Sequence, residues 1–289
     1  MSAAWALDGP YGMRKRWRRA SSTPGTALTR PGDIVYSAVQ ATHDAALIHP
    51  LSKDTMSEQI SIQTTDGVFD CYVARPAAAA AQAPVIVIIQ EIFGVNAGIR
   101  AIADGYAAKG YIAIAPDLFW RAQPGLELAE SNPDDVTQAF AMYKAYDVEK
   151  GVQDIAAAVT AARTLAGASG KVGVTGYCLG GLLTYLAAAG TDADAFAAYY
   201  GGGIDQHLDK VARITRPLLV HLAGDDAYIG ADAQAAIQAA VAGKPDTEVH
   251  IYPGCDHAFA RPGGAHHDAA ATTLANSRTD AFFQQHLAS

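Results

Sequence analysis

The chain has 289 residues, half of them hydrophobic, and a formal net charge of −8. This length allows one sizeable core, and no apolar run reaches the roughly 18 residues that a membrane-spanning helix requires. Residues 1–55 carry seven Lys and Arg against four Asp and Glu, a charge of +3, so the remaining residues carry −11. A body this acidic argues against nucleic acid as a partner.

Residues 1–55 differ in composition from the rest of the chain. The basic cluster at 14–19 is followed by Ser, Thr, Pro and Gly, with no sustained period of 2 or 3.6. A secretion signal is rejected because Ser21–Asp33 contains no apolar segment. We predict that residues 1–55 are a disordered extension, or upstream sequence from a start codon assigned too early, and that residues 56–289 form a single domain.

From residue 60 onward, short β-branched runs alternate with longer helical patterns. The first two runs predict a hairpin around Asp66-Gly67, and the later runs are apolar throughout, as in strands buried on both faces of a parallel sheet. Strands are expected at 60–64, 68–74, 84–89, 111–115, 172–176, 195–200, 217–223 and 247–252, and helices at 98–109, 133–146, 149–165, after residue 178, at 231–241 and at 267–286. This order predicts an α/β fold, a mostly parallel doubly wound sheet with an antiparallel start.

The stretch KVGVTGYCLGGLL joins an apolar strand to an Ala-rich helix through a sharp turn, with Cys178 at its corner. G-x-C-x-G is the cysteine form of the nucleophile elbow, whose glycines make room for a strained turn. The turn places the sulfur at a helix N-terminus, which favours a thiolate. The alternative is a structural cysteine before a closely packed helix, because free cysteine is among the most buried residue types.

A cysteine nucleophile needs a base, and the base needs a group that orients it. His257 lies in a loop after the last predicted strand, at the sheet edge where Cys178 emerges. Asp225 and Asp226 follow the strand at 217–223, and the spacing leaves both open as the orienting acid. The chain order of nucleophile, acid and histidine is that of the α/β-hydrolases. The alternative makes the two aspartates a turn or helix cap and the histidine a loop residue.

Further polar groups are expected at the same edge, where ligands bind in such sheets. Glu91 ends the PVIVII strand, and a carboxylate there requires hydrogen bonds or a proton. The backbone N–H groups of Ile92 and Leu179 occupy the positions from which this fold builds an oxyanion hole. Arg121 and Arg261 follow strand ends, and two guanidinium groups converging on one cleft would clamp a carboxylate. Alternatively, Arg121 and Arg261 form ion pairs on the surface.

The chain from about residue 56 to 287 resembles the dienelactone hydrolases (carboxymethylenebutenolidases), a family of α/β-hydrolases with a cysteine nucleophile. The matching stretches are PVIVIIQEIFGVN, PDLFWRAQPG, VGVTGYCLGG, LAGDDAYIG, HAFARPGG and TLANSRTDAF. The resemblance implies an α/β-hydrolase fold and hydrolysis of 4-carboxymethylenebut-2-en-4-olide to maleylacetate, in the breakdown of aromatic compounds.

The resemblance also implies roles for single residues. It makes Cys178, Asp226 and His257 the catalytic triad, with Asp226 rather than Asp225 at the acid position. It matches Glu91 to a glutamate that hydrogen-bonds the resting thiol. It matches two further residues to arginines that bind the substrate carboxylate, namely Arg121 and Arg261.

Two other functions remain open on the sequence. A broader carboxylesterase or thioesterase would use the same triad on another acyl group. A flavodoxin-like glyoxalase or chaperone would pair a glutamate with an elbow cysteine without needing Asp226 and His257. We expect no metal and no cofactor, a small anionic lactone as substrate, no nucleic-acid or membrane partner, and a monomer. Three cysteines without paired spacing suit a reducing compartment, so we expect the cytoplasm.

Overall fold

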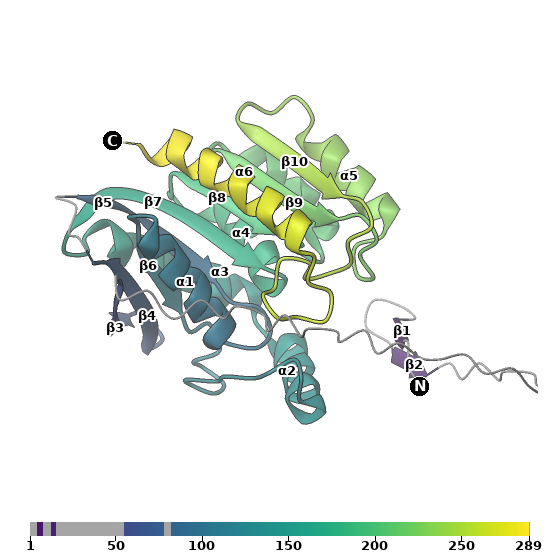
Figure 1. Ribbon diagram of the computed structural model, residues 1–289, viewed down its shortest axis with the longest axis horizontal. Coiled ribbons are helices and arrows are strands. Elements are labelled where there is room, and N and C mark those ends of the chain that lie inside the picture. Colours follow the sequence, from purple (N-terminus) through teal and green to yellow (C-terminus); the bar gives the residue numbers. More distant parts are fainter. Residues whose placement is uncertain (1–4, 8–12, 16–54, 78–81, 289) are drawn as a thin grey trace, which may run out of the picture. The chain divides into compact units, whose positions relative to one another are not determined.

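The computed structural model describes residues 5–7, 13–15, 55–77 and 82–288 (Figure 1). The chain divides into two units, residues 1–48 and residues 49–289. In the first unit, strands β1 (Trp5–Leu7) and β2 (Met13–Lys15) pair antiparallel with each other. The prediction of an extension over residues 1–55 otherwise lies outside the described residues.

The larger unit is built on an eight-stranded sheet with the spatial order β10-β9-β8-β7-β5-β6-β4-β3. Strand β4 pairs antiparallel with both β3 and β6, and all other neighbours are parallel. The predicted fold class, an α/β-hydrolase sheet with an antiparallel start, is therefore confirmed. The strands are β3 (Thr55–Gln63), β4 (Val68–Pro76), β5 (Ala83–Ile89), β6 (Ile112–Pro116), β7 (Ala168–Tyr177), β8 (Ala195–Tyr199), β9 (Leu218–Ala223) and β10 (Thr247–Tyr252).

Helices cover both faces of the sheet, because its central strands are apolar on both sides (Figure 1). Helices α1 and α6 share one face, where the rings of Tyr106 and Phe283 lie 6.2 Å apart. Helices α3 and α4 pack together on the other face. The helices are α1 (Ala97–Ala108), α2 (Pro133–Ala145), α3 (Val148–Arg163), α4 (Leu179–Gly190), α5 (Ala231–Val241) and α6 (Ala269–Leu287), with the 3-10 segment η1 (Ile204–Arg213).

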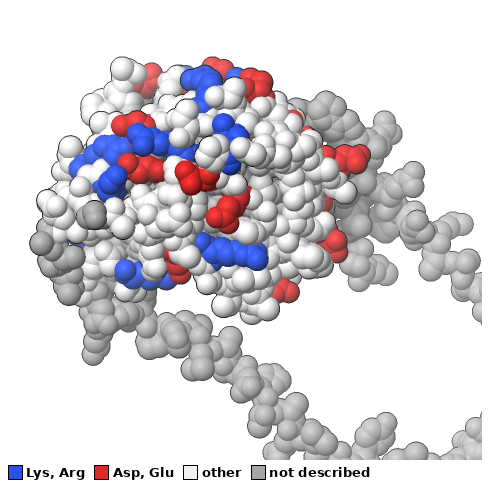
Figure 2. Space-filling model, turned by 90° about the horizontal axis from the view of Figure 1, so that it is seen from above, with Lys and Arg blue, Asp and Glu red and all other residues white. Residues whose placement is uncertain are grey.

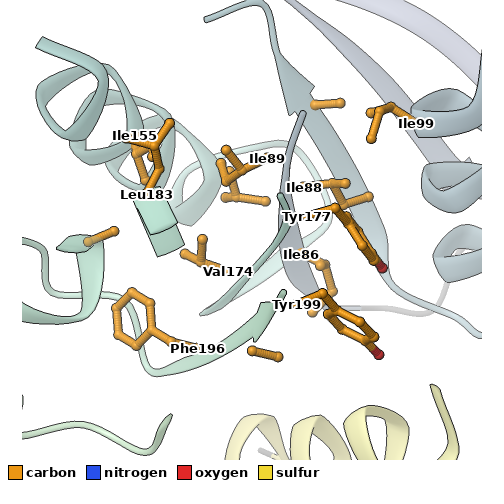
Figure 3. Close-up of a cluster of buried hydrophobic side chains, with 14 of the residues drawn as sticks. Ile86, Ile88, Ile89, Ile99, Ile155, Val174, Tyr177, Leu183, Phe196 and Tyr199 are labelled. Atoms are coloured by element: carbon orange, nitrogen blue, oxygen red, sulfur yellow. The ribbon is translucent and has the colours of Figure 1, made fainter. Parts of the chain in front are cut away.

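The core alternates across the sheet, as the period of two along each strand requires (Figure 3). Ile86 and Ile88 of β5 point to the same side as Tyr199 of β8, whereas Ile89 points to the other side, toward Leu183 of α4. All five side chains are fully buried. The central strands therefore pack against apolar side chains on both faces. This packing holds their ends in place, and the loops that carry the polar residues of the site begin at those ends.

Four elements differ from the sequence-based expectation. Strand β7 begins at Ala168 rather than at residue 172, because Ala168 already pairs with Ala83 of β5. Strand β3 begins at Thr55 rather than at residue 60, because it pairs with β4 from Thr55 opposite Pro76 onward. Segment η1 was not expected; it is a 3-10 segment that is interrupted at His207. Helix α6 begins two residues later than expected, after Asp268 caps it by accepting from the N–H of Ala271.

The surface carries both signs of charge. On the face shown in Figure 2, Lys and Arg side chains are interspersed with Asp and Glu. Among the described residues, no helix is both long and apolar enough to cross a bilayer.

Gly176 offers a test of how tightly β7 packs on α4. A Cβ atom there would collide with the backbone carbonyl of Gly180 and the hydroxyl of Thr184. We expect Gly176→Ala to lower the free energy of unfolding by about 3 kcal/mol, measured by urea denaturation. The control is Gly105→Ala in α1, where a Cβ meets open space and should stabilise by about 0.5–1 kcal/mol. Equal effects of the two variants would contradict this account.

Candidate active site

Cys178 occupies the corner between β7 and α4 in a left-handed conformation, with φ 55° and ψ −115°. Its N–H donates to the carbonyl of Tyr199 at 3.1 Å, which ties the corner to the next strand. The turn is pressed against backbone on both sides. A Cβ at Gly180 would collide with the carbonyl of Ile89, and one at Gly181 with that of Tyr199. The strain at the cysteine therefore persists because the surrounding backbone leaves the turn no other space.

His257 and Asp226 lie in two loops that leave the neighbouring strands β10 and β9. Nδ1 of His257 lies 3.1 Å from Oδ1 and 3.0 Å from Oδ2 of Asp226. The same carboxylate accepts from the backbone N–H groups of Tyr228 and Ile229, at 2.8 and 3.1 Å. The fully buried carboxylate is thus held by its own loop and in turn orients the imidazole. Asp225 does not share in this contact, so the structure brings Asp226 to the histidine.

The charge of Cys178 acts directly on the ring of His257. Burial lowers the pKa of His257, but the negative charge of the Cys178 thiolate and the hydrogen bonds with Asp226 and Cys178 outweigh it and raise the pKa to about 10. The imidazole of His257 is therefore protonated near neutral pH. Cys178, Asp226 and His257 lie far apart in the sequence, and the fold brings their side chains together.

A cavity of about 240 Å³ opens above Cys178 and His257. Most of its wall is apolar, with aromatic and aliphatic side chains from the loop after β5 and from α2. Besides its histidines, the charged side chains of the wall are Glu130 and Arg261. The lining includes Ile92, Phe93, Glu130, Val136, Phe140, Tyr143, Leu179, Tyr228, Arg261 and His266.

The two residues expected to supply an oxyanion hole line this cavity beside the sulfur. Leu179 is the first residue of α4, so its N–H has no carbonyl partner within the helix. Ile92 follows the end of β5, on the strand next to β7. Both residues line the cavity together with Cys178, so their backbone N–H groups remain the candidate donors to an oxyanion.

Glu91 was expected to hydrogen-bond the thiol of Cys178, but in the structure it pairs with Arg261. Its carboxylate accepts from Nε of Arg261 at 2.6 Å and from Nη2 at 3.1 Å, a bidentate pair. It lines a second cavity of about 140 Å³ together with Tyr177 and Tyr200, and not the cavity above Cys178. In this structure the partner of Glu91 is thus the guanidinium rather than the thiol.

Arg121 does not converge on the cavity with Arg261. Its Nη1 and Nη2 donate to the two carboxylate oxygens of Asp154, at 2.6 and 3.0 Å, and Nε donates to Asp66. Asp154 has a side chain only 1% exposed, so it needs this cation. Hydrogen bonding to Asp154 raises the pKa of Arg121. The expected clamp of two arginines is therefore not formed, because a buried carboxylate from α3 occupies one of them.

Three features of the site escaped the sequence analysis. Tyr228 follows Asp226 by two residues and stands edge-on to His257, with ring centroids 4.9 Å apart. The ring of Tyr200 also stands edge-on to the imidazole, with centroids 5.2 Å apart, and its buried hydroxyl has no hydrogen-bond partner among the described residues. The third feature is the apolar face of α2. Tyr228 could have been found from the sequence, because it lies two residues after Asp226. The sequence does not show which face of α2 lines the cavity.

A metal site is not apparent in the part of the chain that the structure describes. There, no group of three or more His, Cys, Asp or Glu side chains is placed to hold an ion. The chemistry open to the site is that of a cysteine sulfur beside an imidazole that a carboxylate orients.

Comparison with known proteins gives independent evidence for the family of this chain. Residues 69–287 match the model of the dienelactone hydrolase family. The chain is 44% identical over 223 residues to a putative carboxymethylenebutenolidase of Azospirillum brasilense, covering 77% of this chain and 95% of that protein. It is 41% identical over 224 residues to a carboxymethylenebutenolidase of Pseudomonas putida, covering 77% and 94% of the two chains.

A solved structure is also similar. The crystal structure of a putative dienelactone hydrolase from Klebsiella pneumoniae superposes with a TM-score of 0.71 at 26% identity. It covers 80% of this chain and 99% of that one. The similarity thus extends over nearly the whole length of the relatives and includes the elbow and both loops of the site.

Asp226 offers a test of the charge balance at His257. Asp226→Asn removes a charge and weakens a hydrogen bond that raise the pKa of His257, while burial still lowers it. We expect the titration midpoint of the ring, followed by NMR, to fall by at least about one unit from about 10. Asp225→Asn in the same loop should leave the midpoint unchanged. A midpoint that stays near 10 in Asp226→Asn would contradict this account.

The assignment of Arg121 to the buried pair with Asp154, rather than to the substrate site, can be tested. Arg121→Ala leaves the carboxylate of Asp154 buried without its cation, so we expect a loss of about 3 kcal/mol of unfolding free energy. Arg75→Ala, which breaks the more exposed pair with Glu58, should cost about 1 kcal/mol or less. Urea denaturation measures both losses. If Arg121→Ala instead kept its stability and selectively raised KM for carboxylated substrates, the arginine would belong to the substrate site after all.

Proposed function

The chain belongs to the dienelactone hydrolase family and is a hydrolase of ester or lactone bonds, and we propose that it opens the dienelactone ring through Cys178, His257 and Asp226. The product would be maleylacetate, in the breakdown of aromatic compounds in the cytoplasm. The observation that carries the proposal is the contact of the imidazole with Asp226 on one side and its electrostatic coupling to Cys178 on the other.

The first half of the reaction uses the thiolate as nucleophile. The sulfur of Cys178 attacks the lactone carbonyl, and the N–H groups of Ile92 and Leu179 stabilise the resulting oxyanion. The ring C–O bond then breaks and the enolate oxygen leaves, giving an acyl-cysteine. An enolate is a better leaving group than an alkoxide, so this step needs little assistance from an acid.

The second half uses the change in charge at the sulfur. The thiolate charge is a main cause of the raised pKa of His257. Once Cys178 is acylated that charge is gone, while burial still favours the neutral ring. His257 therefore gives its proton to the enolate and becomes a base. It then activates the water that cleaves the thioester, with Asp226 holding the tautomer.

Arg261 is the guanidinium available to a ligand in the cavity. Its side chain is 16% exposed and lines the cavity wall. Burial lowers the pKa of Arg261, but the charges of Glu91 and Glu130 outweigh burial and raise it, so the group stays charged. The substrate carboxylate would therefore meet one arginine rather than two.

The test is hydrolysis of dienelactone by the purified chain and by two variants of the nucleophile. We expect Cys178→Ala to lower kcat by at least about 1,000-fold, because covalent catalysis is lost. Cys178→Ser should retain a little activity, since the base is still present. Cys255→Ala is the matched control, because this cysteine is buried outside the cavity. Near-normal turnover by Cys178→Ala would refute the proposed nucleophile.

A further inference from the structure

The acid Asp226 and the base His257 lie in separate loops, so their contact depends on how the two loops are joined. The acid loop comprises residues 224–230, between β9 and α5, and the histidine loop comprises residues 253–268, between β10 and α6. The N–H group of Asp225, directly before the acid, donates to a backbone carbonyl of the histidine loop at 2.8 Å. On that side of the acid, backbone alone joins the loops.

On the other side of the acid, the loops are joined by the side chain of Asp256. Its Oδ1 accepts from the N–H group of Ala227 at 3.0 Å and from that of His257 at 2.6 Å. Its Oδ2 lies 3.0 Å from Nδ1 of His266, whose ring lines the cavity together with Cys178. One carboxylate therefore connects the acid loop, the backbone of the base and the wall of the cavity.

The carboxylate of Asp256 is ionised in this position. Burial raises its pKa, but the hydrogen bonds from the backbone N–H groups of His257 and Ala227 outweigh burial and lower the pKa. Hydrogen bonds to an ionised acceptor are roughly twice as strong as those between neutral groups. The bond between the two loops is therefore one of the stronger kind.

We propose that Asp256 is a positioning residue that holds the acid and the base of the triad in register. It does not line the cavity itself and acts through Ala227, which lies directly after Asp226. Without this bond, the acid loop is joined to the histidine loop only before the acid, and the carboxylate is free to move away from the imidazole. The inference rests on the proposed function, because it assumes that Asp226 and His257 serve Cys178.

The test compares three variants of Asp256 in the full chain, with p-nitrophenyl butyrate and dienelactone as substrates. Asp256→Asn keeps an oxygen that can accept from both N–H groups, and its amide can donate to Nδ1 of His266. Asp256→Glu keeps the charge but displaces the oxygens by one methylene group. Asp256→Ala removes all three contacts.

We expect kcat to decrease in the order wild type, Asp256→Asn, Asp256→Glu, Asp256→Ala. The loss should be about threefold or less in Asp256→Asn and about 10- to 100-fold in Asp256→Ala, without a rise in KM, because small displacements of catalytic groups lower kcat steeply. If Asp256→Glu is the most active variant, the effect belongs to the charge and the inference is overturned. The order of Asp256→Asn and Asp256→Glu decides this even if Asp256→Ala does not fold.

The matched control is Asp225→Ala in the acid loop. This exposed residue joins the loops through its backbone N–H group, which the substitution leaves in place, so kcat should not change. Thermal midpoints are measured for all variants, because a purely structural role would lower the midpoint of Asp256→Ala and leave the kcat of its folded fraction unchanged. That result, or equal losses of kcat in Asp225→Ala and Asp256→Ala, would also overturn the inference.

The two proposals fail separately. If the wild type does not hydrolyse dienelactone but the kcat for the butyrate ester follows the expected order, the proposed substrate is wrong and the role of Asp256 stands. If dienelactone is hydrolysed and Asp256→Ala keeps its kcat, the role of Asp256 is wrong and the proposed function stands.

Discussion

The close packing of the turn at Cys178 is the constraint on which the site depends. A non-glycine residue with φ 55° is costly, and it is kept because glycines at 180 and 181 bring α4 against the carbonyls of β5 and β8. The same packing holds Cys178 at the wall of the cavity, directly before the first residue of α4. A backbone argument thus accounts for the place of the sulfur beside the cavity.

The side chains of the site interact electrostatically in sequence, from Asp226 through His257 to Cys178. Asp226 is fixed by two backbone N–H groups of its own loop and in turn holds His257, while the interactions of the ring with Cys178 and Asp226 raise its pKa. Because each group restrains the next, one chemical change at the sulfur alters the role of the imidazole. The proposed reaction needs no large movement of these side chains, only the loss of one charge.

The arginines show how the same residue type is used differently within one fold. Arg121 supports the interior, since it compensates a carboxylate of α3 that the core has buried. Arg261 stands between a buried carboxylate and a half-exposed one at the cavity. Both guanidinium groups are thus paired with carboxylates of the chain itself, one in the interior and one at the cavity wall.

The sequence by itself determined the sheet type, the elbow and the chain order of Cys178, Asp226 and His257, because strand burial, glycine spacing and strand ends are local patterns. Only the tertiary structure decided where the arginines point, since the carboxylates that hold them lie 33 residues from Arg121 and 170 residues from Arg261. Long side chains choose among charges that only folding brings near. For the same reason the sequence did not show that α2 lines the cavity, or that Glu130 pairs with Arg261 there.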